Sequence, residues 1–156
     1  MTRISFVILG EPASKANSRK IVKIAGKTRS VKSEKALGFE AMALPQIPPR
    51  ARVQMTCPVS VTLRIFYASE RPDLDESVVL DVMQDRYASE KLTPMQKACG
   101  VKAKRVLVQR GVYVNDRQVR EKHVYHAIDR NNPRTEVVVE PLSSLMHQPK
   151  LDLEVA

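Results

Sequence analysis

Alternation of apolar and polar positions marks the clearest strand of this chain, within residues 53 to 67. After Pro58, apolar residues occupy every second position, and this period of two places them on one face of an extended strand. These residues are Val59, Val61, Leu63, Ile65 and Tyr67. Shorter extended patterns predict further strands at residues 4 to 9, 119 to 128 and 136 to 140, and a hairpin at residues 20 to 25 and 28 to 31.

Helical spacing of apolar residues predicts two helices. The first covers residues 33 to 44, with Ser33 as its N-cap and Pro45 at its end. The second begins close to Asp75 and carries a repeated apolar set: Val78, Val79, Val82 and Met83. Strands on both sides of these helices predict an α+β domain with a mixed sheet and helices packed on it.

The length of 156 residues accommodates one domain, predicted at residues 1 to 142. Residues 143 to 156 are expected to form a tail that is disordered or serves a partner. Residues 14 to 19 are predicted to be a loop, and residues 84 to 110 a long connection.

The net charge of +9 is unevenly distributed along the chain. Residues 1 to 35 contain nine basic and two acidic residues, residues 97 to 130 contain nine and three, and residues 68 to 90 contain two and seven. Such runs are either solvated faces or the footprint of a nucleic acid. The first basic run stands among Gly, Pro, Ser and Asn, which favours the footprint, because a flexible basic loop can follow a phosphate backbone.

Composition indicates which kind of nucleic acid the protein binds and in which compartment it is expected. Aromatic residues make up 4% of the chain and Trp is absent, which argues against a single-strand stacking platform and favours duplex or branched DNA. The two cysteines and three histidines lack the spacing of a zinc site or a disulfide framework. There is neither an apolar run of membrane-spanning length nor a signal peptide, so a cytoplasmic location is expected.

Three carboxylates, Asp73, Asp75 and Glu76, stand within four residues between the long strand and the second helix. The spacing of Asp73 and Glu76 fits a capping box, so a structural role at the helix N-terminus is one interpretation. Capping accounts for one of the two aspartates but not for both, and carboxylates this close repel unless a cation or proton relieves them. A divalent-cation site is the other interpretation.

A second segment, residues 111 to 119, forms a turn before a strand and contains the carboxylate of Asp116. With it, the chain resembles the RusA-type Holliday junction resolvases of bacteriophage and prophage origin, in element order over most of residues 4 to 140. The resemblance rests on Asp73-Leu74-Asp75 after a strand, Val114-Asn115-Asp116-Arg117-Gln118-Val119 before another, and the opening Gly10-Glu11-Pro12 followed by Ser14-Lys15 and a basic loop.

The resemblance implies a RusA-like intertwined homodimer, an endonuclease that cuts four-way (Holliday) DNA junctions by paired incisions in recombination and repair. It implies that Asp73, Asp75 and Asp116 are the catalytic carboxylates and hold Mg²⁺, with Mn²⁺ as a substitute; Mg²⁺ prefers hard oxygen ligands of this kind. Glu76 is expected to be an additional metal ligand or an outer-shell acceptor. The residues expected to hold the junction backbone are Lys15, Arg19, Lys20, Arg71, Arg117 and Arg120.

Departures from the family leave alternatives open. Glu76 stands where the family often has Asn, and Val79 stands where it has a lysine thought to help catalysis. Either a cation from elsewhere (Arg71, Lys15 or Lys20) replaces this lysine, or the activity is weakened or lost. Residues 84 to 110 exceed the family's connection and are expected to add DNA contacts. The other readings are a non-catalytic DNA-binding protein and a general metal-dependent nuclease on flaps or duplexes.

Overall fold

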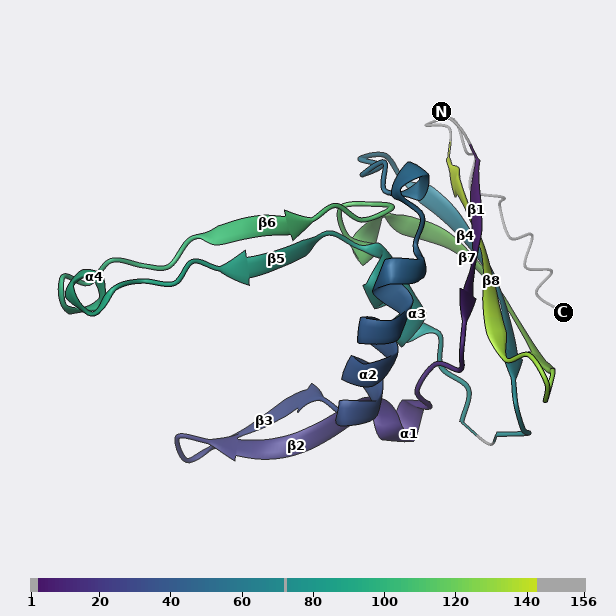
Figure 1. The fold of residues 1–156 in the computed structure, drawn as a ribbon, viewed down its shortest axis with the longest axis horizontal. Helices are drawn as coiled ribbons and strands as arrows, with labels where there is room; N and C mark the ends of the chain where they lie inside the picture. The colour runs from purple at the N-terminus through teal and green to yellow at the C-terminus, as the bar shows by residue number, and fades with distance from the viewer. Residues whose placement is uncertain (1–2, 72, 143–156) are drawn as a thin grey trace, which may run out of the picture.

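The structure, a computed structural model, describes residues 3–71 and 73–142. Its body is a four-stranded mixed sheet in the order β1-β8-β4-β7 (Figure 1). β4 runs parallel to β7 and antiparallel to β8, and β8 runs antiparallel to β1. The strands are β1 (Ile4–Leu9), β4 (Val59–Tyr67), β7 (Val119–Ile128) and β8 (Arg134–Pro141). The α+β class with a mixed sheet is confirmed; the predicted tail lies outside the described residues.

Two helices, α2 (Glu34–Ala43) and α3 (Ser77–Met83), lie on one face of this sheet (Figure 1). The alternation predicted for β4 has its cause here, because its apolar side chains join those of α3 in one core in which Leu63, Ile65 and Val79 are 0% exposed. Full burial of such a side chain stabilises the fold by about 1.5–3 kcal/mol.

The ends of α2 follow the predicted signals. The Ser33 hydroxyl accepts a hydrogen bond from the backbone N–H of Ala36 at 3.1 Å, which satisfies one donor at the helix start. Pro45 follows the helix and lies in a 3₁₀ turn, η1 (Leu44–Gln46). A second 3₁₀ turn, η2 (Pro49–Ala51), and the residues after it delay the start of β4 to Val59, so the strand is shorter than residues 53 to 67 suggested.

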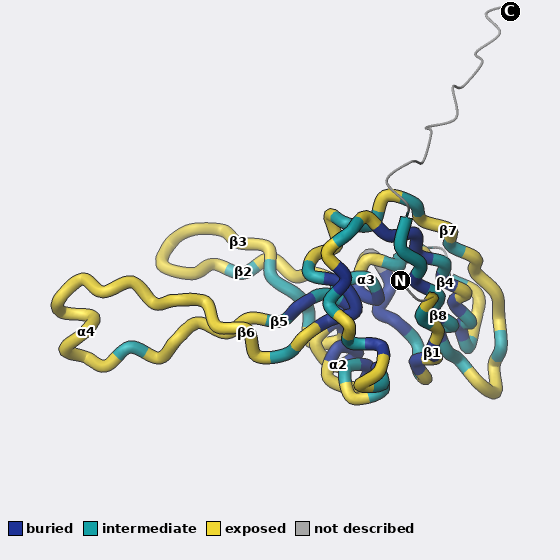
Figure 2. Tube along the Cα trace, turned by 90° about the horizontal axis from the view of Figure 1, so that it is seen from above, coloured by how far each residue is buried: buried dark blue, intermediate teal, exposed yellow. Residues whose placement is uncertain are grey.

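Two ribbons project from the body on the same side (Figures 1 and 2). The first, arm A, is the predicted hairpin, formed by β2 (Arg19–Ile24) and β3 (Lys27–Lys32). The second, arm B, consists of β5 (Arg86–Ser89), α4 (Pro94–Ala98) and β6 (Arg105–Gln109).

Arm B corrects the interpretation of residues 84 to 110, because this segment is an antiparallel ribbon with a helical turn at its tip rather than an irregular connection. The segment at residues 14 to 19 also differs from the predicted loop, since it contains the short helix α1 (Lys15–Ser18). The strands β5 and β6 and the helix α1 are each too short to leave a readable hydrophobic period.

A buried carboxylate joins the roots of the two arms. The Glu40 side chain in α2 is 4% exposed; its Oε1 pairs with Lys32 Nζ at the end of β3, and its Oε2 pairs with Arg86 Nη2 at the start of β5, at 3.2 Å. Lys32 also pairs with Asp81 of α3 at 3.0 Å. Burial lowers the pKa of Lys32, but its bonds to Glu40 and Asp81 more than offset this and raise it above 10.5.

A second buried carboxylate fixes the return of arm B to the body. Asp85 Oδ1 accepts the Gly111 N–H at 2.7 Å and Oδ2 accepts Gln54 Nε2 at 2.6 Å. Gly111 is required at this point, since a Cβ there would lie 2.4 Å from the carbonyl oxygen of Met83. The chain then enters the turn η3 (Asp116–Gln118), which precedes β7.

Candidate nuclease site

The acidic loop, residues 73 to 76, connects the end of β4 to the start of α3. Asp73 Oδ2 accepts the backbone N–H of Ala16 in α1 at 3.0 Å, across 57 residues of sequence. This bond lowers the pKa of Asp73 below its ordinary 3.8. Burial opposes the shift, and Ser14 and Arg71 lower the pKa further. The loop therefore presents an ionised carboxylate at the base of basic arm A.

Asp75 forms the start of α3. Its Oδ1 accepts the Ser77 N–H at 3.0 Å and its Oδ2 accepts the Ser77 hydroxyl at 2.8 Å. Its backbone bonds to the hydroxyl of Tyr67, whose pKa is raised by burial despite that bond and the nearby Arg71. Asp75 is thereby attached to the last residue of β4.

Glu76 faces β7, where its carboxylate pairs with the Lys122 ammonium. Burial opposes its ionisation, but Lys122, with a contribution from His126, holds the pKa of Glu76 below its ordinary value. The capping box of Asp73 and Glu76 is therefore wrong, because Asp73 bonds to α1 and Glu76 to β7. As a metal ligand, Glu76 has to give up part of its bond to Lys122.

A cavity of about 400 Å³ opens between the acidic loop, α1 and α2. Its charged and polar lining consists of Glu11, Ser14, Asn17, Lys35, Arg71 and Asp73. Lys35, the second residue of α2, has no distinctive pattern in the sequence, because a lysine on a helix surface has none. Lys35 lines the same cavity as Asp73, whereas Val79, where the resemblance implies a lysine, is 0% exposed.

Glu11 and Arg71 form one wall of this cavity. They pair at 2.8 Å, and the other oxygen of Glu11 accepts the backbone N–H of Ala68 at 3.1 Å. The Arg71 guanidinium also lies 5.2 Å from the ring centroid of Tyr67. Its Nη1 also donates to the Pro12 carbonyl at 3.4 Å, so Arg71, predicted to contact DNA, is held by three protein groups and shapes the wall.

Asp116 lies apart from this cavity. It precedes β7, whose first residue, Val119, pairs with Val59 at the start of β4, whereas the acidic loop follows the end of β4. The turn that contains Asp116 contacts α3. The pKa of the nearby Tyr113 is raised by burial and, to a smaller extent, by the charges of Asp116 and Asp81. Across residues 3–71 and 73–142, no three Asp, Glu, His or Cys side chains form a group that could hold a metal ion.

By donor type alone the acidic loop suits Mg²⁺, since it offers the hard carboxylate oxygens that the ion prefers. The joint site of Asp73, Asp75 and Asp116 stays a prediction.

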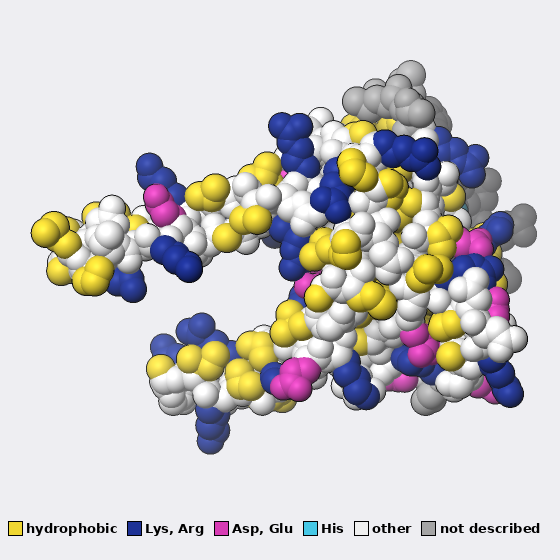
Figure 3. Space-filling view, viewed as in Figure 1, with side chains coloured by type: hydrophobic (Ala, Val, Ile, Leu, Met, Phe, Trp, Pro, Cys, Tyr) yellow, Lys and Arg dark blue, Asp and Glu magenta, His cyan; other side chains and the backbone are white. Residues whose placement is uncertain are grey.

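The basic residues predicted to contact DNA fall into two places. Lys15 lies in α1 and Arg19 and Lys20 in β2, at the root of arm A, where Lys20 pairs with Glu34 at 3.1 Å. Arg117 and Arg120 are exposed at the opposite end of β4, in η3 and β7. Lys and Arg side chains also gather on both arms, where Asp and Glu are sparse (Figure 3).

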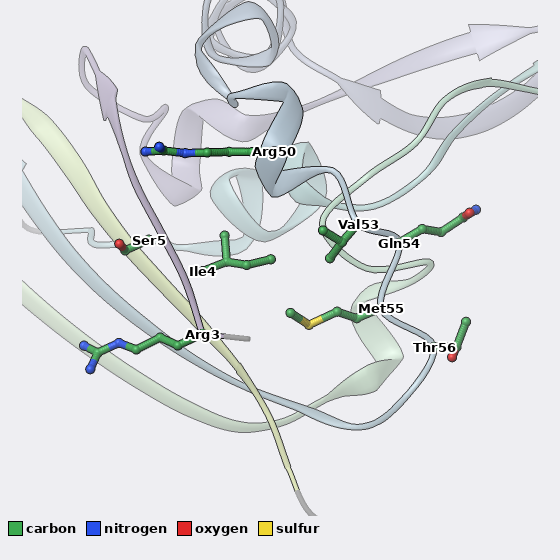
Figure 4. A pocket seen from close by; sticks show the side chains of 8 residues that line it. All are labelled: Arg3, Ile4, Ser5, Arg50, Val53, Gln54, Met55 and Thr56. Carbon is green, nitrogen blue, oxygen red and sulfur yellow. The ribbon is translucent and has the colours of Figure 1, made fainter. Parts of the chain in front are cut away.

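A cavity of about 560 Å³ lies elsewhere, between β1 and residues 50 to 56 (Figure 4). Its lining residues are Arg3, Ile4, Ser5, Arg50, Val53, Gln54, Met55 and Thr56. This lining supplies neither a carboxylate nor an imidazole, so it offers no general base or hard metal ligand for hydrolysis.

Comparison of the chain with protein-family models and with curated proteins finds no match. Within residues 3–71 and 73–142, every helix is too short or too polar to span a bilayer.

Proposed function

We propose that this protein is a Mg²⁺-dependent endonuclease that acts on branched DNA, in particular on four-way junctions. The observation that carries the proposal is the bond from Ala16 to Asp73, because it places an ionised carboxylate loop at the root of a strongly basic ribbon. A phosphodiester backbone that follows the ribbon reaches the acidic loop directly. Excess positive charge nearby offsets the repulsion between phosphate and carboxylates.

Asp73 and Asp75 are the residues that would hold Mg²⁺; Asp116, the further ligand that the resemblance implies, precedes β7 beside the other end of β4 and lies outside this pair. When bound, the ion activates water and offsets charge on the phosphate in the transition state. The bond from Ala16 fixes the orientation of the Asp73 carboxylate, and Ser77 fixes that of Asp75. Lys35, on the cavity wall, is the cation proposed to face the phosphate oxygens in place of the family lysine.

Paired incision requires two such sites on symmetric strands, so we propose a homodimer as the active form. Four-way junctions present strands related by a two-fold axis, which a dimer with two-fold symmetry can engage in the same way on both sides. A site that acted alone would cut one strand per encounter and leave the junction nicked.

The test incubates the wild-type protein with a synthetic four-way junction and with linear duplex, with and without Mg²⁺. We expect Mg²⁺-dependent cleavage of the junction, and for Asp75→Asn a fall in rate of about 100-fold or more with junction binding retained or increased. The matched control is Glu140→Gln, which also removes one negative charge but lies in β8 beside Arg3, at the other end of the sheet. Equal cleavage by wild type and Asp75→Asn refutes the assignment.

A second function, a non-catalytic DNA-binding protein, is favoured by one observation: both oxygens of Asp75 are already bonded to Ser77. Under this reading the wild type binds the junction but leaves it intact at every Mg²⁺ concentration. Cleavage of linear duplex at the same rate as the junction identifies a general metal-dependent nuclease instead.

A further inference from the structure

Both arms are strongly basic over their whole length. Residues 19 to 32, arm A, contain six Lys or Arg and no acidic residue. Residues 86 to 109, arm B, contain six Lys or Arg and one acidic residue, Glu90. Charge of one sign on two neighbouring ribbons repels, so the arrangement favours a polyanion placed between them.

The two arms are held in fixed relation rather than attached independently. Glu40 pairs with Lys32 at the root of arm A and with Arg86 at the root of arm B, and its side chain is 4% exposed. Both ribbons leave the body on the same side, and the space-filling view shows an open gap between them (Figures 2 and 3). Anchoring on one buried carboxylate predefines the width of that gap, which lowers the ordering cost of binding.

The arms also expose large apolar side chains that the body does not cover. Ile21 on arm A and Met95 at the tip of arm B are each 77% exposed, and Val108 on β6 is 67% exposed. The tip is locally ordered, because Thr93 and Gln96 form a capping box at the start of α4. A two-stranded ribbon fits the major groove of DNA, and exposed apolar side chains such as Met and Pro are the kind that insert between base steps from the minor groove.

We propose that arms A and B clasp one DNA duplex between them, with the tip of arm B in a groove of that duplex. This inference rests on the proposed function only in its DNA-binding part and is independent of cleavage. On a branched substrate, the clasp grips one duplex branch and delivers its backbone to the acidic loop at the root of arm A. Arm B therefore adds the contacts that determine where along a branch the site acts.

The test measures binding to duplex and to four-way junction without divalent metal, over a series of salt concentrations. One triple variant removes three exposed charges from arm B: Lys97→Ala, Lys102→Ala and Lys104→Ala. A second removes three from arm A: Lys23→Ala, Lys27→Ala and Arg29→Ala. The matched control removes three from the body: Arg3→Ala, Arg50→Ala and Arg130→Ala.

Each arm variant is expected to reduce the slope of log K against log salt by about 2 to 3, since each lost phosphate contact removes about 0.9. The body variant is expected to leave the slope unchanged. Met95→Ala is expected to weaken binding at constant slope, because an apolar contact releases no counterions. Hydrogen exchange of the arm amides confirms that each ribbon remains folded.

Three results overturn the clasp: equal slopes for arm and body variants, loss of slope in only one arm variant, or an arm variant that alters the oligomeric state while DNA binding stays intact. The last result assigns the arms to contacts between copies of the chain. Because binding is measured without Mg²⁺, and is repeated with Asp75→Asn, an intact clasp with no cleavage refutes the nuclease alone. Cleavage with unchanged slopes refutes the clasp alone.

Discussion

Replacement of Glu40 by Gln tests whether one buried carboxylate holds the two arms in place. The substitution preserves the size of the side chain and removes its charge. It also replaces one accepting oxygen by an NH₂ group, which points a donor at one of two cations, Lys32 or Arg86. The Glu40 side chain is 4% exposed, so water cannot take over its role at either oxygen.

The expected destabilisation follows from the exposure of the partners. Breaking a fully buried ion pair costs about 3–5 kcal/mol, and a single hydrogen bond to a charged group contributes about 1.5–3 kcal/mol. The side chains of Lys32 and Arg86 are 32% and 34% exposed, so water compensates part of the loss, and Lys32 keeps Asp81 at 3.0 Å. We therefore expect Glu40→Gln to lower the free energy of unfolding by about 2–3 kcal/mol.

Urea denaturation followed by circular dichroism measures this loss. With a slope m of about 1–3 kcal/mol per molar urea, the midpoint is expected to fall by about 0.7–3 M. Hydrogen exchange of β3 and β5 amides is expected to accelerate at the same time. The control, Glu140→Gln, interrupts an exposed contact with Arg3 at 3.6 Å and is expected to cost less than about 1 kcal/mol. A loss below about 0.5 kcal/mol, or unchanged exchange in both arms, refutes the anchoring role.

Three further predictions concern the site and its support. Ser14→Ala removes one of the bonds that keep the pKa of Asp73 below 3.8, so a carboxylate titration by NMR is expected to show this pKa rising. The stability that Asp73 contributes above pH 3.8 is then lost at a higher pH as the solution is acidified. An unchanged midpoint of the Asp73 titration contradicts the contact with Ser14. Tyr113→Phe removes the 2.8 Å bond from the buried phenol to the Leu80 carbonyl and is expected to lower the free energy of unfolding, measured by heat or urea, by about 1–2 kcal/mol. An unchanged free energy of unfolding contradicts a stabilising role for this bond. Lys35→Ala is expected to slow junction cleavage about tenfold or more with unchanged unfolding, whereas Lys35→Arg retains most of the rate; equal rates for all three proteins remove Lys35 from the site.

Much of the body could be predicted from the sequence, because its elements have a clear period. β4 alternates since its apolar side chains enter the core between Pro58 and the acidic loop, and α3 repeats its valines for the same reason. Ser33 marked the start of α2, where its hydroxyl does accept the Ala36 N–H. In each case burial of one face imposes the pattern that is then readable.

Arm B could not be predicted in this way. A ribbon exposed on both faces has no core side, so its residues need not alternate, and β5 and β6 carry Tyr87, Val106 and Leu107 without a readable period. Their pairing depends on the root, where Asp85 and Arg86 are fixed by Gly111 and Glu40. These contacts join residues far apart in sequence, and no local rule specifies them.

The candidate site divides along the same line. The sequence alone determined that Asp73, Asp75 and Glu76 cluster between a strand and a helix, because residues within four positions of one another cannot lie far apart in space. Only the tertiary structure decided where each carboxylate points: Asp73 toward Ala16, Asp75 toward Ser77, Glu76 toward Lys122. The orientation of a charged side chain depends on which partners the folded backbone brings within hydrogen-bonding distance. Asp75 finds its partner two residues along the chain, whereas the partners of Asp73 and Glu76 come from distant segments.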